Sequence, residues 1–237
     1  MIELVFVIVI VGILSSVISS SFERNTLREA ADQVVSHIRY TQHLAMVDDK
    51  FVPNPEMSKE STQARKSKHA QEWFRGRWQI RFHRTVDTAV VWSYSIFSDT
   101  LGTVSYGGEP DEGELAKSPQ NPQQYLTGGF SGGVVGLDSP QRVKRMALGE
   151  KYGIDAIVFS PSCTNNQGIN QSRRISFDYI GRPFQSDLSN TASWTKPYQS
   201  DKIIQSPCNI VLSSGNRSIT ITIEPETGHT YISSQTF

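Results

Sequence analysis

The feature that most constrains the fold is the apolar run that opens the chain. Residues 1–18 read MIELVFVIVIVGILSSVI, and Glu3 is their only ionisable side chain. A helix needs about 20 apolar residues to cross a bilayer core, with about 17 as the lower limit. The run therefore predicts that residues 1–21 form a membrane-spanning helix with Glu3 at the interface.

A cleaved signal peptide is the alternative interpretation of this run. It requires a basic segment before the apolar residues and a small-residue cleavage site after them. No basic residue precedes the run, although the serine-rich stretch at 15–20 resembles a cleavage site. The composition favours the membrane helix.

Helical periodicity resumes in residues 22–47. Leu27, Ala31, Val34, Ile38 and Ala45 recur at spacings of four, three, four and seven, which define one helix face. The second half of a continuous helix from 2 to 47 must lay this face on a coiled-coil partner or on a sheet of the same chain. Polar residues at 41 and 42 interrupt this apolar face, which favours packing on a sheet of the same chain over a coiled coil.

Alternating residues predict that sheet in the rest of the chain. Arg77–Arg84 and Ala89–Phe97 alternate apolar and polar residues around a turn, as a hairpin does. Five further strands or short apolar runs are predicted at residues 154–160, 173–178, 209–212, 218–224 and 229–232. The predicted fold class is α+β, with a long N-terminal helix on antiparallel sheets and a β-rich domain over 48–237 that contains long loops at 48–72 and 98–150.

Residues 1–14, MIELVFVIVIVGIL, resemble the N-terminal segment of type IV pilins and type II secretion pseudopilins. The resemblance implies that Glu3 forms an assembly salt bridge with the terminal amine of a neighbouring subunit. In that family a prepilin peptidase cleaves a basic leader and methylates the new N-terminus. Prepilin peptidase is therefore an expected partner if a leader lies upstream of Met1.

A second resemblance covers the C-terminal third. Residues 175–183 (ISFDYIGRP) and 217–228 (RSITITIEPETG) are similar to the end of the minor pseudopilins and pilins of the GspH/FimT family. The resemblance implies a structural subunit of a type II secretion or type IV pilus filament, with other pilins and the inner membrane as partners. It also implies a single-pass inner-membrane location with the C-terminal domain in the periplasm, no enzymatic activity and no cofactor.

The charge distribution suggests a nucleic-acid surface as an alternative. The chain has 23 basic and 23 acidic residues, yet eight basic residues fall within 59–84. Arg65, Lys66 and Lys68, near Trp73 and Phe74, are candidate contacts, because phosphates attract cations and bases stack on aromatic rings. FimT-like pilins are associated with DNA uptake, so a DNA-binding minor pilin in natural transformation is the second function considered. The favoured interpretation is a solvated loop, with Arg77 and Arg81 on a solvated strand face.

Cys163 and Cys208 are the two cysteines of the chain. In a cytosolic protein they would be buried thiols, whereas an oxidising periplasm favours a disulfide. The expected bond ties the strand near Ser160 to the strand that begins at Asn209.

Three further patterns have weak chemical meaning. Residues 129–133 (GFSGG) match the G-x-S-x-G pattern, and a hydrolase would depend on Ser131 with His229, but the flanks fit no strand-turn-helix. His37 and His43, six residues apart, are expected at the surface rather than as metal ligands. The acidic residues at 109–114 match no calcium loop, so we predict no metal site.

Overall fold

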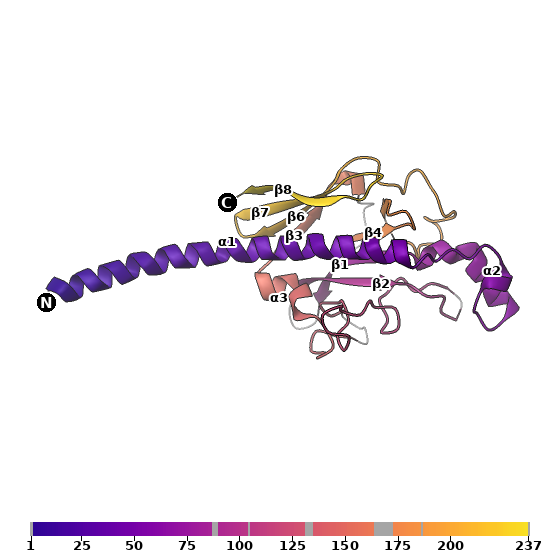
Figure 1. Cartoon of the computed structure of the whole chain (residues 1–237), viewed down its shortest axis with the longest axis horizontal. Coiled ribbons are helices and arrows are strands. Elements are labelled where there is room, and N and C mark those ends of the chain that lie inside the picture. The colour runs from indigo at the N-terminus through magenta and orange to yellow at the C-terminus, as the bar shows by residue number, and fades with distance from the viewer. Residues whose placement is uncertain are drawn as a thin grey trace.

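One long helix and two antiparallel sheets form the fold (Figure 1). The computed structural model describes residues 2–86, 90–103, 105–130, 135–163, 173–185 and 187–236. The first sheet has the order β2-β1-β4-β5, with β1 Trp78–Val86, β2 Val90–Ser98, β4 Arg173–Phe177 and β5 Pro183–Gln185. The second has the order β3-β6-β7-β8, with β3 Ala156–Phe159, β6 Cys208–Ser214, β7 Arg217–Ile223 and β8 Thr230–Thr236.

The helix α1, Ile2–Val47, has 46 residues and packs on both sheets through its second half. Figure 1 shows α1 running along the line between the sheets, with its N-terminal half extending beyond them. The predicted apolar face is confirmed, because all five of its members are buried: Leu27, Ala31, Val34, Ile38 and Ala45. These residues share one core cluster with the inward side chains of both sheets.

Polar side chains of α1 add directed bonds to this packing. Arg39 Nε donates to the Thr230 carbonyl at 3.0 Å, and Gln42 Nε2 donates to the carbonyls of Gly181 at 2.8 Å and Thr227 at 2.7 Å. The turn before β8 can lie this close to Gly181 because residue 228 is a glycine. Its φ is +63°, and a Cβ there would lie 2.6 Å from the Gly181 carbonyl oxygen. These bonds fix the rotation of α1 about its own axis as well as its position.

The structure corrects the expected membrane segment. Within the described residues, no helix combines the length and the apolar character that a membrane crossing requires. The predicted fold class with a membrane-spanning first half of the helix is therefore wrong, and so is the predicted single-pass inner-membrane location with a periplasmic domain.

The hairpin of the first sheet and the C-terminal strands match their predicted positions. β1 and β2 pair antiparallel with Ile80 opposite Ile96, and β6, β7 and β8 form a continuous antiparallel series. The predicted turn at 85–88 lies partly outside the described residues. The alternation of apolar and polar residues was a sufficient signal for these pairings.

The second face of the first sheet is buried, which corrects the predicted solvated strand face. Gln79, Arg81 and His83 are 1%, 5% and 3% exposed, and Arg77 just before β1 is 3% exposed. Segments that follow β2 and β5 cover this face. Phe97, Leu115, Tyr125 and Val135 form a separate apolar cluster there, and single bridges join Ser95 to Thr127 and Phe97 to Leu115.

Short helices interrupt the two predicted loops. Within 48–72 the chain forms η1, Pro55–Met57, and α2, Gln63–Glu72, where the Thr62 side chain caps the helix by accepting from Arg65 N. Residues 98–150 contain η3, Lys144–Met146. Around Tyr125 the chain forms single bridges only. The remaining short helices are η2 Trp73–Gly76, α3 Leu148–Tyr152 and η4 Pro161–Cys163.

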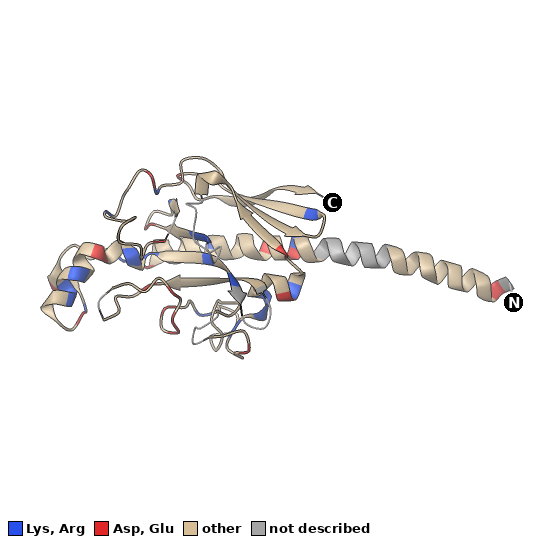
Figure 2. Ribbon diagram, turned by 180° about the vertical axis from the view of Figure 1, so that it is seen from behind, with Lys and Arg blue, Asp and Glu red and all other residues tan. Residues whose placement is uncertain are grey.

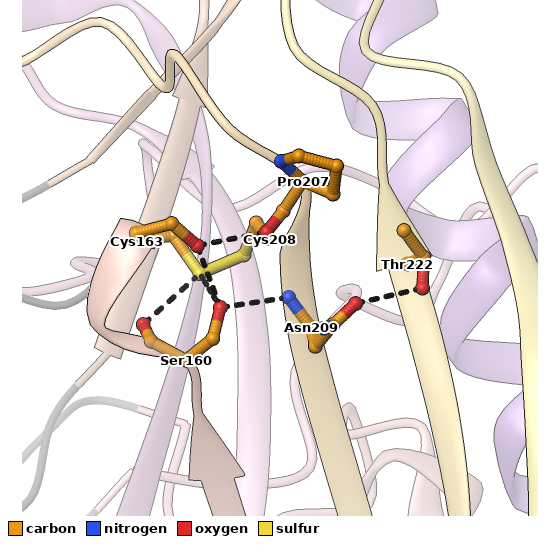
Figure 3. The surroundings of a disulfide bond; sticks show 7 residues. Ser160, Cys163, Pro207, Cys208, Asn209 and Thr222 are labelled. Carbon is orange, nitrogen blue, oxygen red and sulfur yellow. Dashed lines mark hydrogen bonds between the residues drawn. A yellow bond between two sulfur atoms is a disulfide. The ribbon is translucent and has the colours of Figure 1, made fainter.

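The predicted disulfide between Cys163 and Cys208 is confirmed, with 5.4 Å between the two Cα atoms (Figure 3). It joins η4 to the first residue of β6. The Ser160 hydroxyl accepts from Asn209 N at 2.9 Å, and Asn209 Oδ1 accepts from the Thr222 hydroxyl at 2.8 Å. The cross-link therefore lies beside a chain of hydrogen bonds across β6 and β7.

Removing the disulfide should destabilise the domain without changing its fold. The bond closes a loop with a sequence separation of 45, and the chain-entropy argument gives about 4 kcal/mol for a loop of that length. The double variant Cys163→Ser/Cys208→Ser should lose free energy of unfolding of this order in a denaturant titration. An unchanged unfolding midpoint would show that the cross-link has no such role.

Candidate functional site

The protruding half of α1 is an apolar surface exposed on every side. The ten residues from Leu4 to Leu14, Gly12 excepted, have exposed fractions between 52% at Val9 and 65% at Leu4. A helix that is apolar all round is normally buried, and a contiguous exposed apolar surface of this extent marks an interaction site. We call residues 3–14 the apolar half of α1.

Local preference does not explain why these residues are helical. The apolar half is rich in valine and isoleucine, whose β-branched side chains lose rotamer freedom in a helix. It also contains Gly12, around which no atom lies within 4 Å of a Cβ position. Helices in proteins owe most of their stability to packing, so this segment is suited to packing against other molecules.

Glu3 lies at the start of the apolar half, in the first turn of α1, and is exposed. A carboxylate there interacts favourably with the positive end of the helix dipole. No described residue forms an ion pair or hydrogen bond with Glu3.

The candidate nucleic-acid residues lie at the opposite end of the molecule, on α2 (Figure 2). Arg65 pairs with Glu60 at 2.6 Å and donates to the carbonyls of Leu101 and Gly102. Lys66 and Lys68 are half-buried on the same helix. Because Arg65 is neutralised and bound to the backbone, the arrangement does not favour a phosphate-binding surface.

The second candidate is the buried polar face of the first sheet. Arg81 pairs with Glu109 at 2.5 Å and Arg174 with Asp187 at 2.8 Å. Burial, and after it the nearby positive charge of Arg81, lowers the pKa of Arg174 to about 10. The covering segments thus supply carboxylates to Arg81 and Arg174, and these two ion pairs hold the loops to the sheet.

Two carboxyl groups meet within these loops. Asp99 is 3% exposed and accepts from Gly108 N at 2.7 Å, and the Glu114 carboxylate accepts from Thr100 N at 2.7 Å. Burial and, after it, the neighbouring Glu114 carboxylate raise the pKa of Asp99 to about 7. A carboxyl group with this pKa is neutral in mildly acidic solution and becomes charged near neutrality.

Other sequence candidates have structural roles or fall outside the described residues. His37 was expected at the surface, but its Nδ1 lies 2.8 Å from the Tyr94 hydroxyl, and burial lowers its pKa to about 4. His43 is exposed. Ser131 lies outside the described residues. Gly129, which begins the same sequence pattern, lies beside β1 of the first sheet, whereas His229 comes just before β8 of the second sheet.

The acidic segment at 109–114 is bound to the domain rather than solvated. Glu109 pairs with Arg81, Glu112 accepts from the Tyr125 hydroxyl at 2.7 Å, and Glu114 is 8% exposed. In the part of the chain that the structure describes, no group of three or more His, Cys, Asp or Glu side chains is placed to hold a metal ion.

One group of aromatic residues is not predicted by any pattern in the sequence. Phe51, Trp73, Tyr179 and Tyr198 line a single cavity with Asp49. They come from four separate segments and share no periodic pattern, so no sequence signal joins them.

Comparisons with models of protein families, with curated proteins and with solved structures find no match to this chain.

The unfolding free energy should depend on pH through Asp99. Its pKa is raised on folding from 3.8 to about 7, so the native state holds a proton that the unfolded state releases, and stability falls as pH rises from about 4 to 7. Asp99→Asn should remove up to about 4 kcal/mol of this fall. Denaturant titrations of both proteins at several pH values measure it; parallel curves would contradict the assignment.

Proposed function

We propose that this chain is a structural subunit of a helical filament of the kind that type IV pilins and type II secretion pseudopilins form, nearest to the GspH/FimT minor subunits. The observation that carries the proposal is the apolar half of α1, which projects from a folded domain and is exposed on all sides. In such a filament this half packs against the equivalent helices of neighbouring subunits. The role is mechanical and supports protein secretion or pilus assembly.

The energetics of burial support assembly through this surface. Fully burying one valine, leucine, isoleucine or phenylalanine side chain contributes about 1.5–3 kcal/mol. Ten such side chains stand more than half exposed in the apolar half. Even partial burial is enough to offset the entropy lost on association, which is at least about 4 kcal/mol.

Glu3 supports a specific register for this packing. A carboxylate buried among apolar helices is costly unless a cation or a hydrogen-bond donor pairs with it. Since no described residue of its own chain pairs with Glu3, only a subunit arrangement that brings a cation to this position avoids the cost. The glutamate would thus penalise other registers.

A charge in the apolar half should prevent association. Val9→Lys places an ammonium group in the proposed helix interface, and Val158→Lys makes the same change at an exposed valine of β3 that lies on the domain. Val9→Lys should weaken self-association at least about tenfold because the buried ammonium lacks a partner. Sedimentation velocity of the full chain measures this, and Val158→Lys should behave like the unmodified protein. Equal effects of the two variants would contradict the proposal.

Glu3 should affect assembly but not the fold. Glu3→Ala removes the carboxylate, and Glu56→Ala removes an exposed carboxylate of η1 as a control. We expect Glu3→Ala to reduce the cross-linked oligomers of the full chain severalfold while its circular dichroism and unfolding midpoint stay unchanged. If Glu3→Ala assembles as well as Glu56→Ala does, the glutamate has no role in register.

A further inference from the structure

Two buried carboxyl groups close the loop that follows β2. Asp99 begins this loop and Glu114 ends it, and both side chains are almost fully buried. Ser98 N donates to the Glu114 carbonyl at 3.1 Å, so the two ends of the loop are adjacent. We call residues 99–103 and 105–114 the carboxyl-closed loop.

Backbone N–H groups of the loop bind three of the four carboxyl oxygens. Gly108 N donates to Asp99 Oδ2 at 2.7 Å. Glu114 Oε1 accepts from Thr100 N at 2.7 Å, and Glu114 Oε2 accepts from Asp111 N at 3.2 Å. Asp99 Oδ1 is buried and has no hydrogen-bond partner among the described residues. The conformation of the loop therefore depends on both carboxyl groups.

No described cation compensates these two carboxyl groups with an ion pair. The basic side chains of the surrounding elements pair with other carboxylates: Arg65 of α2 with Glu60, Arg75 of η2 with Glu72, Arg81 of β1 with Glu109 and Arg174 of β4 with Asp187. The other titratable side chains of the loop are Tyr106, Asp111 and Glu112, and none of them is basic. The pair therefore has to balance its own charge.

A shared proton provides that balance. The Asp99 and Glu114 side chains interact directly, and two buried carboxylates in contact are costly when both are ionised. With one proton held between them, one carboxyl group donates to the other. Burial and, after it, the Glu114 carboxylate raise the pKa of Asp99 to about 7, so this proton is lost near neutrality.

The closed loop also holds the α2 segment. Arg65 of α2 donates from Nη1 to the Gly102 carbonyl at 2.5 Å and from Nη2 to the Leu101 carbonyl at 2.8 Å. Leu101 and Tyr106 are buried and pair through a single bridge inside the loop. A change in the loop would therefore reach the bonds that Arg65 forms with it.

We propose that Asp99 and Glu114 form a pH-sensitive latch, which keeps the loop closed while the two side chains share one proton and lets it open when that proton is lost to solvent. Loss of the proton leaves two adjacent carboxylates that repel each other, and opening lets water solvate both. The latch belongs to the folded domain and does not depend on filament formation, so it goes beyond the proposed function.

Hydrogen exchange of the full chain in nonionic detergent tests the latch. The closed loop binds a proton that the open loop releases, so opening becomes more favourable as pH rises from about 4 to 7. After correction for the intrinsic pH dependence of exchange, protection of the Thr100, Gly108 and Asp111 amides should fall at least about tenfold between pH 5 and pH 7. Constant protection over this range would overturn the proposal.

Urea distinguishes opening of the loop from unfolding of the whole domain. Local opening exposes little surface, so exchange of the three amides should not change in low concentrations of urea. Exchange that accelerates with urea as steeply as global unfolding does would show that the loop opens only when the domain unfolds, and the latch would be rejected.

Two variants locate the titrating group. Asp99→Asn keeps an acceptor for Gly108 N but cannot lose the proton, so protection of the loop should stay the same from pH 5 to pH 7. Asp138→Asn changes an exposed carboxylate outside the loop and should keep the tenfold fall. If the two variants show the same fall, Asp99 is not the group that controls the loop and the proposal is wrong.

Discussion

The packing of one helix face against two sheets is the constraint on which the rest of the structure depends. Val34 and Ile38 of α1 are fully buried, and they belong to the same core as residues of both β1 and β7. Neither sheet has its own helix of comparable length. Loss of this contact would expose the inward faces of both sheets together, which explains why the two sheets form one cooperative core rather than separate units.

The first sheet is unusual because polar residues on its second face are also buried. A strand whose two faces are both covered usually reads as a continuous apolar run. In β1 the second face contains Arg81 and His83, and the covering loops provide Glu109 and backbone carbonyls for them. The loops after β2 therefore acquire a fixed conformation from charge pairing where regular secondary structure is sparse.

The sequence predicts some elements and not others for physical reasons. The spacing from Leu27 to Ala45 and the alternation from Trp78 to Phe82 are local patterns, and they predicted the buried face of α1 and the core side of β1 with Ile80 and Phe82. Burial of Arg81 was not predictable, because it depends on a distant glutamate in an aperiodic loop. The protruding half of α1 was visible as an apolar run, whereas Asp49 and Tyr198, which line one cavity, are brought together only by the fold.

The bonds from Arg39 to the first residue of β8 and from Gln42 to two turn carbonyls have a consequence for the geometry of any assembly. They fix the helix azimuth relative to the domain, and α1 is unbroken from Ile2 to Val47. Each residue of an α-helix turns the chain by about 100° and advances it about 1.5 Å. The number of residues between Glu3 and Arg39 thus determines the direction in which the domain lies about the helix axis, relative to Glu3. A single insertion between them would leave both ends of the helix intact but would rotate the domain to a different side of that axis.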